Sequence, residues 1–377
     1  MFALAWKFIR FDKAKSVGII TAIVISIFLI GQQVGLLLFL MGLMGNLVGN
    51  ANVKDNQIWV IESQTQNANT LTKIDLRYVQ QLQSINGVEQ AFPVVIGNAE
   101  AKFLDGNTAA VQIIGSDAPD FVIGPNPTRI FQGNLSDLSL PEAVSVEFFN
   151  AKSWNTDLYL NKQIELNSKS AQVKLITKNA QAFGGNYVYT NLFNARFYGN
   201  VDPSKVSLIV LNLDKNSNKQ NVINLINTQY PNLRAWDTKA LQNSTVKEIL
   251  ISSNMGMSFG TLVVFAMISG FFIIGLTLYS SALDRVKDYG TLKAIGANKT
   301  YVNKLLITQA LLYALIGFSV AFLLLIGFSQ GVKKSGLEIN FSLGFVSFLL
   351  GITLFISIGG SLFAVRKISK LEPASVF

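Results

Sequence analysis

The side chains with the clearest capacity for specific chemistry lie in one short charged segment, 283–297, between two long apolar runs. Its charges include Arg285, Lys287 and Asp288. Apolar side chains recur there at every third position, namely Val286, Tyr289, Leu292 and Ile295. This spacing is typical of an amphipathic helix that lies along a membrane face and offers its charged side to a soluble partner. An ordinary charged loop is the alternative.

The residues that follow predict a tight turn and a second helix. Gly296 can end the first helix in a left-handed conformation, and Asn298 or Thr300 can cap the next one. The segment is therefore expected to fold as helix, turn, helix.

Several common chemistries are excluded by composition. The chain has no cysteine and no histidine, which rules out disulfides, thiolate chemistry and every Ser-His or Cys-His arrangement. Carboxylate or Ser-Lys catalysis remains open, but no spacing favours it. No G-x-x-x-x-G-K-[ST] sequence is present, since Gly296-Ala-Asn-Lys-Thr300 lacks the leading glycine. Energy for any mechanical work must therefore come from another subunit that docks on this chain.

The composition indicates a membrane protein. Half of the 377 residues are hydrophobic and 14% are charged. Four stretches carry no charge: Ser16–Val53, Ile249–Leu283, Leu305–Val332 and Ile339–Val365. Since about 20 apolar residues suffice to cross a bilayer as a helix, each stretch is long enough for one span. None has a charged residue in it, so a proton or ion relay through the membrane is not expected.

The distribution of charge predicts the sidedness of these spans. The formal charge is +9, yet residues 54–248 carry equal numbers of basic and acidic side chains. The excess lies in the N-terminal segment, in 284–304, in the C-terminal tail and, by one charge, in the loop at Lys333 and Lys334. Positive residues collect on the cytoplasmic side, so both termini and 284–304 are expected inside. The excess flanks apolar runs without interleaved aromatic platforms, which argues against nucleic-acid binding.

The predicted fold class is an α-helical membrane protein with four spans and a large external α+β domain between the first and the second. The predicted regions, in chain order, are an interfacial helix at 1–15, a span at 16–44, the external domain with its stalk at 45–250, a span at 251–283, a cytoplasmic segment at 284–304, a span at 305–328, a short external loop at 329–341, a span at 342–365 and a cytoplasmic tail at 366–377.

In the external domain, alternating apolar residues predict strands at 57–61, 88–96, 108–114, 163–166, 173–177 and 206–213. Helices are expected at 75–85 and 217–228, and a link between two lobes at 123–134. Phe183-Gly-Gly185 and the nearby aromatics, including Tyr187, either line a contact surface or pack in a core or hinge.

Two features near the N-terminus suggest packing roles. Phe2, Trp6 and Ile9 fall on one helical face, which fits a helix lying against the inner leaflet of the lipid bilayer. Gly31 and Gly35 allow close helix approach, and Gln32 can hydrogen-bond across an interface. Packing within the subunit and dimerisation are both compatible with this pattern.

The charged segment also resembles a known signature. It reads Asp284-Arg285-x-x-Asp288-x-Gly290-x-Leu292-Lys293-Ala294-x-Gly296-Ala297 and is similar to that of FtsX/MacB-type permeases, the membrane subunits of ABC systems. The ending at 364–374 resembles the C-terminal border of that family. Without a fused ATPase, the chain is most similar to the DevC-like branch, whose permeases pair with a separate ATPase.

This resemblance implies a site that couples the chain to the ATPase. The residues it implies are Arg285, Asp288, Tyr289, Gly290, Leu292, Lys293 and Gly296. Two positions depart from the family pattern: Asp288 stands where a Glu is usual, and Gln309 where many members carry a Glu. The first keeps a carboxylate with shorter reach, whereas the second leaves the role of a carboxylate there open.

The resemblance further implies a non-catalytic permease that works by mechanotransmission. Two copies would pair with two ATPases, which bind the ATP and Mg²⁺, while the permease binds no cofactor or metal itself. A periplasmic membrane fusion protein and a TolC-like outer-membrane channel would complete an export system in the bacterial inner membrane, with a glycolipid or another amphiphile as its substrate. The alternatives are a permease that releases lipoproteins or regulates a cell-wall hydrolase, and an ATP-independent receptor or anchor.

Overall fold

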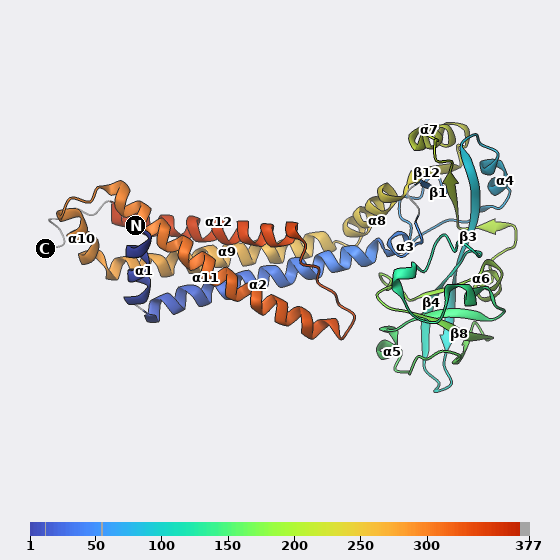
Figure 1. Ribbon diagram of the computed structural model, residues 1–377, viewed down its shortest axis with the longest axis horizontal. Coiled ribbons are helices and arrows are strands. Elements are labelled where there is room, and N and C mark those ends of the chain that lie inside the picture. Colours follow the sequence, from blue (N-terminus) through green and yellow to red (C-terminus); the bar gives the residue numbers. More distant parts are fainter. Residues whose placement is uncertain (12, 54–55, 370–377) are drawn as a thin grey trace. The chain divides into compact units, whose positions relative to one another are not determined.

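The computed structural model describes residues 1–11, 13–53 and 56–369 (Figure 1). Two compact units are present, one formed by Met1–Phe39 together with the chain from Met255 onward, the other by Leu40–Asn254. Most of the predicted tail, including Pro373 and Ala374, lies outside the described residues.

The first unit is helical. Its elements are α1 (Phe2–Phe11), α2 (Lys13–Met44), α9 (Met255–Asp284), α10 (Val286–Ala294), α11 (Lys299–Lys333) and α12 (Leu343–Ser369). Within the described ranges, four helices are long and apolar enough to cross a membrane: α2, α9, α11 and residues Leu343–Arg366 of α12. The spans and the large domain between the first two agree with the predicted fold class.

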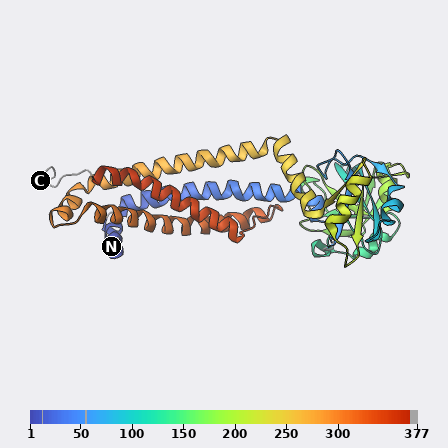
Figure 2. The ribbon, with the colours of Figure 1, turned by 90° about the horizontal axis from the view of Figure 1, so that it is seen from above.

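The spans pack through glycines. Helices α9 and α12 lie side by side (Figures 1 and 2), and a Cβ added to Gly360 of α12 would lie 2.9 Å from the backbone nitrogen of Gly275 in α9. Gly31 of α2 faces Leu325 and Leu349, since a Cβ there would overlap a methyl group of Leu325. Small residues thus let these helices approach closely.

Helix α1 is held against this unit. The Ser16 hydroxyl donates to the Ile9 carbonyl oxygen at 2.7 Å and lies 2.8 Å from the Tyr313 hydroxyl of α11. Ile9 is buried together with Ala5, whereas Phe2 and Trp6 are exposed. The prediction that Ile9 shares with Phe2 and Trp6 the face that lies against the inner leaflet is therefore wrong, because Ile9 belongs with Ala5 to the stripe that packs on the other helices.

The second unit is built on a ten-stranded mixed sheet. One path through it runs β12-β1-β11-β3-β7-β8-β5, while β4 pairs with β3 and β9, and β6 pairs with β8. The strand bounds are β1 Gln57–Glu62, β3 Val88–Lys102, β4 Thr108–Gly115, β5 Ile130–Gln132, β6 Ala143–Glu147, β7 Gln163–Leu166, β8 Lys169–Thr177, β9 Tyr187–Thr190, β11 Leu208–Leu213 and β12 Leu233–Asp237. A separate pair joins β2 (Ile74–Asp75) to β10 (Lys205–Val206).

Short helices surround this sheet. They are α3 Asn46–Gly49, α4 Tyr78–Gln83, α5 Asn150–Ser153, α6 Leu192–Gly199, α7 Lys219–Gln229 and α8 Thr238–Ser252, with 3-10 turns at Pro127–Arg129 and Leu135–Ser139. The helix predicted at 75–85 begins only at Tyr78. The Asp75 carboxylate accepts from the Arg77 backbone N–H and pairs with its guanidinium, and Asp75 itself pairs with Lys205 in β10.

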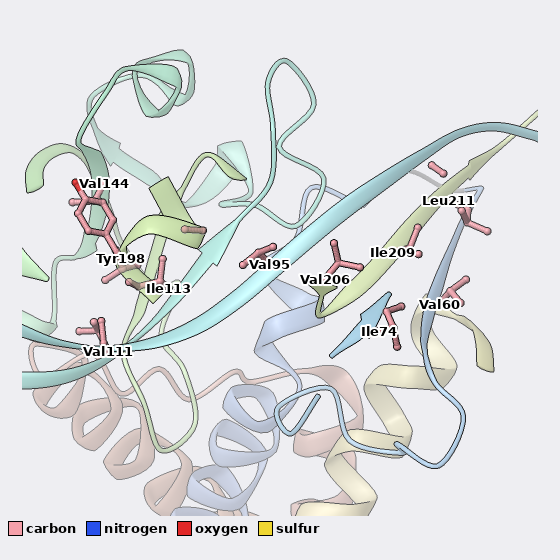
Figure 3. Packing of buried hydrophobic residues seen from close by; sticks show 14 of the residues in the cluster. Val60, Ile74, Val95, Val111, Ile113, Val144, Tyr198, Val206, Ile209 and Leu211 are labelled. Atoms are coloured by element: carbon pink, nitrogen blue, oxygen red, sulfur yellow. The ribbon is translucent and has the colours of Figure 1, made fainter. Parts of the chain in front are cut away.

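The long strand β3 connects the two halves of the sheet. Residues 88–94 pair with β11, and residues 95–102 pair with β4. Alternate side chains enter two cores: Val95 packs in a cluster with Val111, Ile113 and Ile209 (Figure 3), and Val94 packs in the other. The predicted link between lobes begins at Ile123, which is a core residue instead, as are Phe121 and Val122 just before it. Their apolar side chains fill the second cluster.

Tryptophans anchor this unit. Trp59 of β1 is fully buried, and the Trp154 ring lies 5.2 Å from the ring of Phe103. The Arg234 guanidinium lies 4.1 Å from the centre of the Trp236 ring on β12. Each of the three is thus held by the sheet or by residues next to it.

Candidate functional site

The charged segment folds as predicted, as a helix, a turn and a second helix. Helix α9 ends at Asp284, Arg285 leaves the helical conformation, and α10 begins at Val286. The Ala297 N–H donates to the Leu292 carbonyl oxygen at 2.9 Å, and the Gly296 N–H donates to that of Lys293 at 3.1 Å. This is a Schellman motif, and Gly296 has the positive φ of +108° that it requires.

Of the two candidate caps, Asn298 is the one that caps the N-terminus of α11. Its side-chain oxygen accepts from the Tyr301 backbone N–H at 2.7 Å. This bond satisfies one of the free donors of the first turn. The turn between α10 and α11 is therefore fixed at both ends.

One side of α10 is buried in the helical unit. Tyr289 is only 1% exposed, and its ring stacks on Phe8 of α1 with centres 5.8 Å apart. The Tyr289 hydroxyl lies 3.5 Å from the Gln309 side-chain oxygen on α11. Burial raises the pKa of Tyr289 to about 12, although the contact with Gln309 acts in the opposite direction. Gly290 is also buried, and Leu292 packs at the edge of the same cluster.

The corner between α9 and α10 is tied to the N-terminal segment. The Asp284 carboxylate forms an ion pair with Lys15 of α2. The Arg285 guanidinium lies 5.1 Å from the ring centre of Phe8 and 5.7 Å from that of Phe11, within cation–π range. Sequence reasoning treated the N-terminal helix as a separate element. No signal in the sequence indicated this contact, because it joins residues that are far apart in the chain.

The other side of α10 faces outward. Lys287, Asp288 and Thr291 are exposed, and so is Ile295, at 80%. The prediction that Ile295 shares the apolar face of Tyr289 is therefore wrong: α10 ends at Ala294, and the turn points Ile295 away. Lys293 is half-buried, and burial together with the positive charge of Lys299 lowers its pKa.

The implied coupling residues thus fall into two groups. Tyr289, Gly290 and Leu292 face the helical unit, whereas Asp288 and Gly296 are exposed. Arg285 and Lys293 are half-buried and lie between the two groups. The exposed side offers charge and one apolar residue on a well-supported helix. It can bind another protein, and it brings together no nucleophile with a base. In the described part of the chain, no group of three acidic side chains is placed to hold a metal ion.

The two candidate packing glycines of the first span make contacts inside the subunit. Gly31 meets α11 and α12, Gly35 meets Ile339, and Gln32 between them is half-buried. The sequence pattern missed Gly275 and Gly360, where helix backbones meet. The Gly359-Gly360 pair within an apolar run was the available signal.

This chain is similar to several solved structures over about half of its length. The solved structures similar to it include the periplasmic region of MacB from Actinobacillus actinomycetemcomitans, with 8% identity, a TM-score of 0.38 and coverage of 51% of this chain and 94% of that one. Another is the extracellular domain of the noncanonic ABC-type transporter YknZ from Gram-positive bacteria, with 11% identity, a TM-score of 0.35 and coverage of 48% and 100%. No curated protein matches the chain.

The match to a family model is the more direct result. Residues 260–373 match the family described as FtsX-like permease C-terminal. The matched region contains most of α9, all of α10 and α11, and α12. The resemblance of the charged segment to FtsX-like permeases is therefore confirmed, and residues 260–373 form an FtsX-like permease domain.

Proposed function

We propose that this chain is the permease subunit of an ATP-driven ABC exporter and that α10 receives the ATPase. The observation that carries the proposal is the position of α10 inside the matched permease region, with its charged side exposed and its other side packed against α1 and α11. A partner that pushes on Asp288 therefore acts on a helix that cannot yield without moving its neighbours. ATP and Mg²⁺ are bound by the separate ATPase, and this chain is not catalytic.

The contacts around α10 support a route for mechanical coupling. Tyr289 joins α10 to α1 through Phe8, and Asp284 joins the end of α9 to α2 through Lys15. Helix α2 is continuous from Lys13 to Met44, and at about 1.5 Å per residue it exceeds the ~30 Å of hydrocarbon that it must cross. Movement of α10 would thus reach the spans that lead out of the membrane, and the large domain would act on substrate there.

The wider assembly follows from the resemblance to DevC-like permeases. In this proposal two copies of the chain dimerise in the bacterial inner membrane, with both termini cytoplasmic and the large domain periplasmic. A membrane fusion protein and a TolC-like channel continue the path, and the substrate is a glycolipid or another amphiphile.

Affinity purification of the tagged chain from its native membrane in mild detergent tests the proposal. We expect a P-loop ATPase to co-elute with the wild type and its recovery to fall at least tenfold with Asp288→Lys, equivalent to ~1.4 kcal/mol, because a like-charge contact replaces an attractive one. Glu89→Lys reverses an exposed charge on the large domain and is the matched control.

The outcomes separate the competing functions. Equal ATPase recovery with Asp288→Lys and Glu89→Lys would remove α10 as the docking site, and no ATPase with the wild type would favour an ATP-independent receptor. A co-eluting fusion protein selects the exporter, whereas a lipoprotein or a hydrolase regulator selects the alternative permease function.

A further inference from the structure

A groove of about 520 Å³ lies on the large domain along the β3–β4 hairpin. The register of the sheet places three of its side chains in one row, because Asn98 of β3 pairs with Gln112 of β4, and Gln112 pairs with Tyr187 of β9. Directly paired residues project on the same face of a sheet. The groove therefore has a floor fixed by three hydrogen-bonded strands.

Along β3, the side chains on the floor of the groove change from buried and apolar to exposed and polar. On this face Val94 and Ile96 are buried in a hydrophobic cluster, whereas Asn98 and Glu100 are exposed. In the described ranges, no protein group hydrogen-bonds the side chains of Asn98, Glu100 or Gln112. Two amides and one carboxylate thus line the groove with their hydrogen-bonding capacity available.

One wall of the groove is the loop between β8 and β9. Its Ala182 packs against the hydrophobic cluster, but Phe183 is outside that cluster and lines the groove. Gly184 and Gly185 follow, and a Cβ at either position would meet no other atom. The loop ends at Asn186, whose side chain donates to the Ala110 carbonyl oxygen at 2.9 Å and whose own carbonyl oxygen accepts from the Gln112 N–H at 2.8 Å. Phe183 is therefore carried on a loop anchored beside the polar row.

The inner end of the row supplies a neutral hydroxyl. Tyr187 is almost fully buried, and its hydroxyl donates to the Asn69 side-chain oxygen at 3.4 Å. Burial raises the Tyr187 pKa, so this group keeps its proton at ordinary pH. A 3.4 Å bond is long, and the phenolic oxygen retains the capacity to accept a hydrogen bond.

The chemistry of the lining selects the class of ligand. Side-chain amides both donate and accept, as each hydroxyl of a sugar does, and a carboxylate accepts from two neighbouring hydroxyls. An aromatic ring such as Phe183 covers the apolar face of a sugar ring. The lining residues that the structure describes carry one carboxylate and no cation, which disfavours phosphate and other anions. The volume is in the range of small-molecule sites.

We propose that this groove binds a neutral sugar unit, held by Asn98, Glu100 and Gln112 and covered by Phe183. The sugar could be the head group of an amphiphile or part of a soluble glycan. In the first case the site rests on the proposed function and identifies the substrate class. Sugar binding is measured without ATPase, so failure of this site and failure of the ATPase docking site are distinguishable.

The test uses the full-length chain in a polyoxyethylene detergent, which has no sugar head group. Methyl glucoside, methyl galactoside and methyl N-acetylglucosaminide are titrated singly, and binding is followed by ligand-observed NMR. We expect at least one to bind saturably, with affinity reduced at least tenfold by Gln112→Leu and by Phe183→Ala. Inorganic phosphate should not bind.

Two matched controls keep the result specific. Gln163→Leu removes an exposed amide of β7, and Phe193→Ala removes an exposed ring of α6, and neither residue lines this groove. Both variants should bind like the wild type. Circular dichroism identifies any variant that fails to fold, and Gln112→Asn then replaces Gln112→Leu.

Two further ligands distinguish the source of the sugar. An octyl glycoside of the preferred sugar, below its micellar concentration, should bind more tightly than the methyl glycoside if an amphiphile head group is the ligand. A soluble oligosaccharide should bind more tightly than the methyl glycoside if a soluble glycan is the ligand. The proposal is overturned if no glycoside saturates by about 50 mM, or if Gln112→Leu and Phe183→Ala bind as the controls do.

Discussion

At the scale of single residues, neighbouring positions of α10 have different tasks. Asp288 is exposed, whereas Tyr289 is buried between Phe8 and Gln309. A substitution at Asp288 should alter only what docks on the helix. A substitution at Tyr289 should instead weaken the packing of α10 on its neighbours. A loss of unfolding free energy is therefore expected for Tyr289 but not for Asp288.

We expect Tyr289→Ala to lower the free energy of unfolding of the helical unit by about 3 kcal/mol, as a large side chain is removed from a packed site. Tyr289→Phe should cost less than ~1 kcal/mol, since the ring stack on Phe8 remains and the 3.5 Å contact with Gln309 is weak. Thermal unfolding in detergent measures both. Equal losses in the two variants would mean that the hydroxyl, and not the ring, holds α10.

Glu147 is a second residue whose surroundings define its behaviour. It is 1% exposed and accepts from the Thr177 hydroxyl at 2.7 Å and from the backbone N–H groups of Asn179 and Ala180 at 2.9 and 3.0 Å. Burial raises the pKa of this carboxyl group, and the three donors only partly offset that effect. The folded domain therefore binds this proton more tightly than the unfolded chain does.

The sign of the pH dependence follows. A raised folded-state pKa stabilises the domain fully below the unfolded value of 4.5, and this contribution is lost as pH rises through the folded-state pKa. We expect the stability of the wild type relative to Glu147→Gln to fall as pH rises from about 4.5. Chemical unfolding at a series of pH values measures it. A stability difference between the wild type and Glu147→Gln that does not change with pH would contradict the assignment.

At the scale of elements, close packing of helices depends on glycines that the sequence pattern did not single out. Gly360 and Gly275 bring the backbones of α12 and α9 together. A Cβ added to Gly360 would lie 2.9 Å from the backbone nitrogen of Gly275. Gly351, on the same helix as Gly360, has open space around it. The two positions form a matched pair.

Gly360→Ala should destabilise the helical unit by about 1–3 kcal/mol, because the added methyl meets backbone that cannot rotate away. Gly351→Ala should be neutral or stabilising by up to ~1 kcal/mol, since alanine favours a helix more than glycine. Melting temperatures in the same detergent give the comparison. A stable Gly360→Ala variant would imply that α9 and α12 pack less closely.

The sequence predicted those helices, strands and turns that are determined by the local pattern of residues. Strand β7 was predicted at its observed bounds, and the turn at Gly296 was predicted from one residue type. Strand β3 was predicted to end at Ile96 but continues to Lys102, because its outer half alternates polar residues and is held by pairing with β4. Local sequence can mark Gly360 as a candidate for close packing, but it does not specify which distant residue it meets, because the pairing of Gly275 with Gly360, or of Phe8 with Tyr289, follows from tertiary packing.

At the scale of the whole molecule, the two units have separate cores. One hydrophobic cluster joins α1 to the spans, and two others fill the sides of the large sheet. The chain enters and leaves the sheet unit at Leu40 and Asn254. A domain with its own core and paired strands has what it needs to fold alone.

We expect a fragment of residues 45–254 to be soluble and to unfold in one cooperative transition, as it retains all strands of the sheet. Circular dichroism in the near ultraviolet and denaturant titration test this. A fragment that binds hydrophobic dye and lacks near-ultraviolet signal would show that the spans contribute to its fold.

The placement of the tryptophans gives the intact protein a built-in optical reporter. Trp59, Trp154 and Trp236 lie in the sheet unit, and Trp6 is the remaining indole of the chain. Intrinsic tryptophan fluorescence therefore comes mostly from the large domain, because the membrane spans contain no tryptophan. A Trp6→Phe variant would make that emission specific to the domain, so spectral changes on addition of ATP and the ATPase would record what reaches the sheet without any attached label.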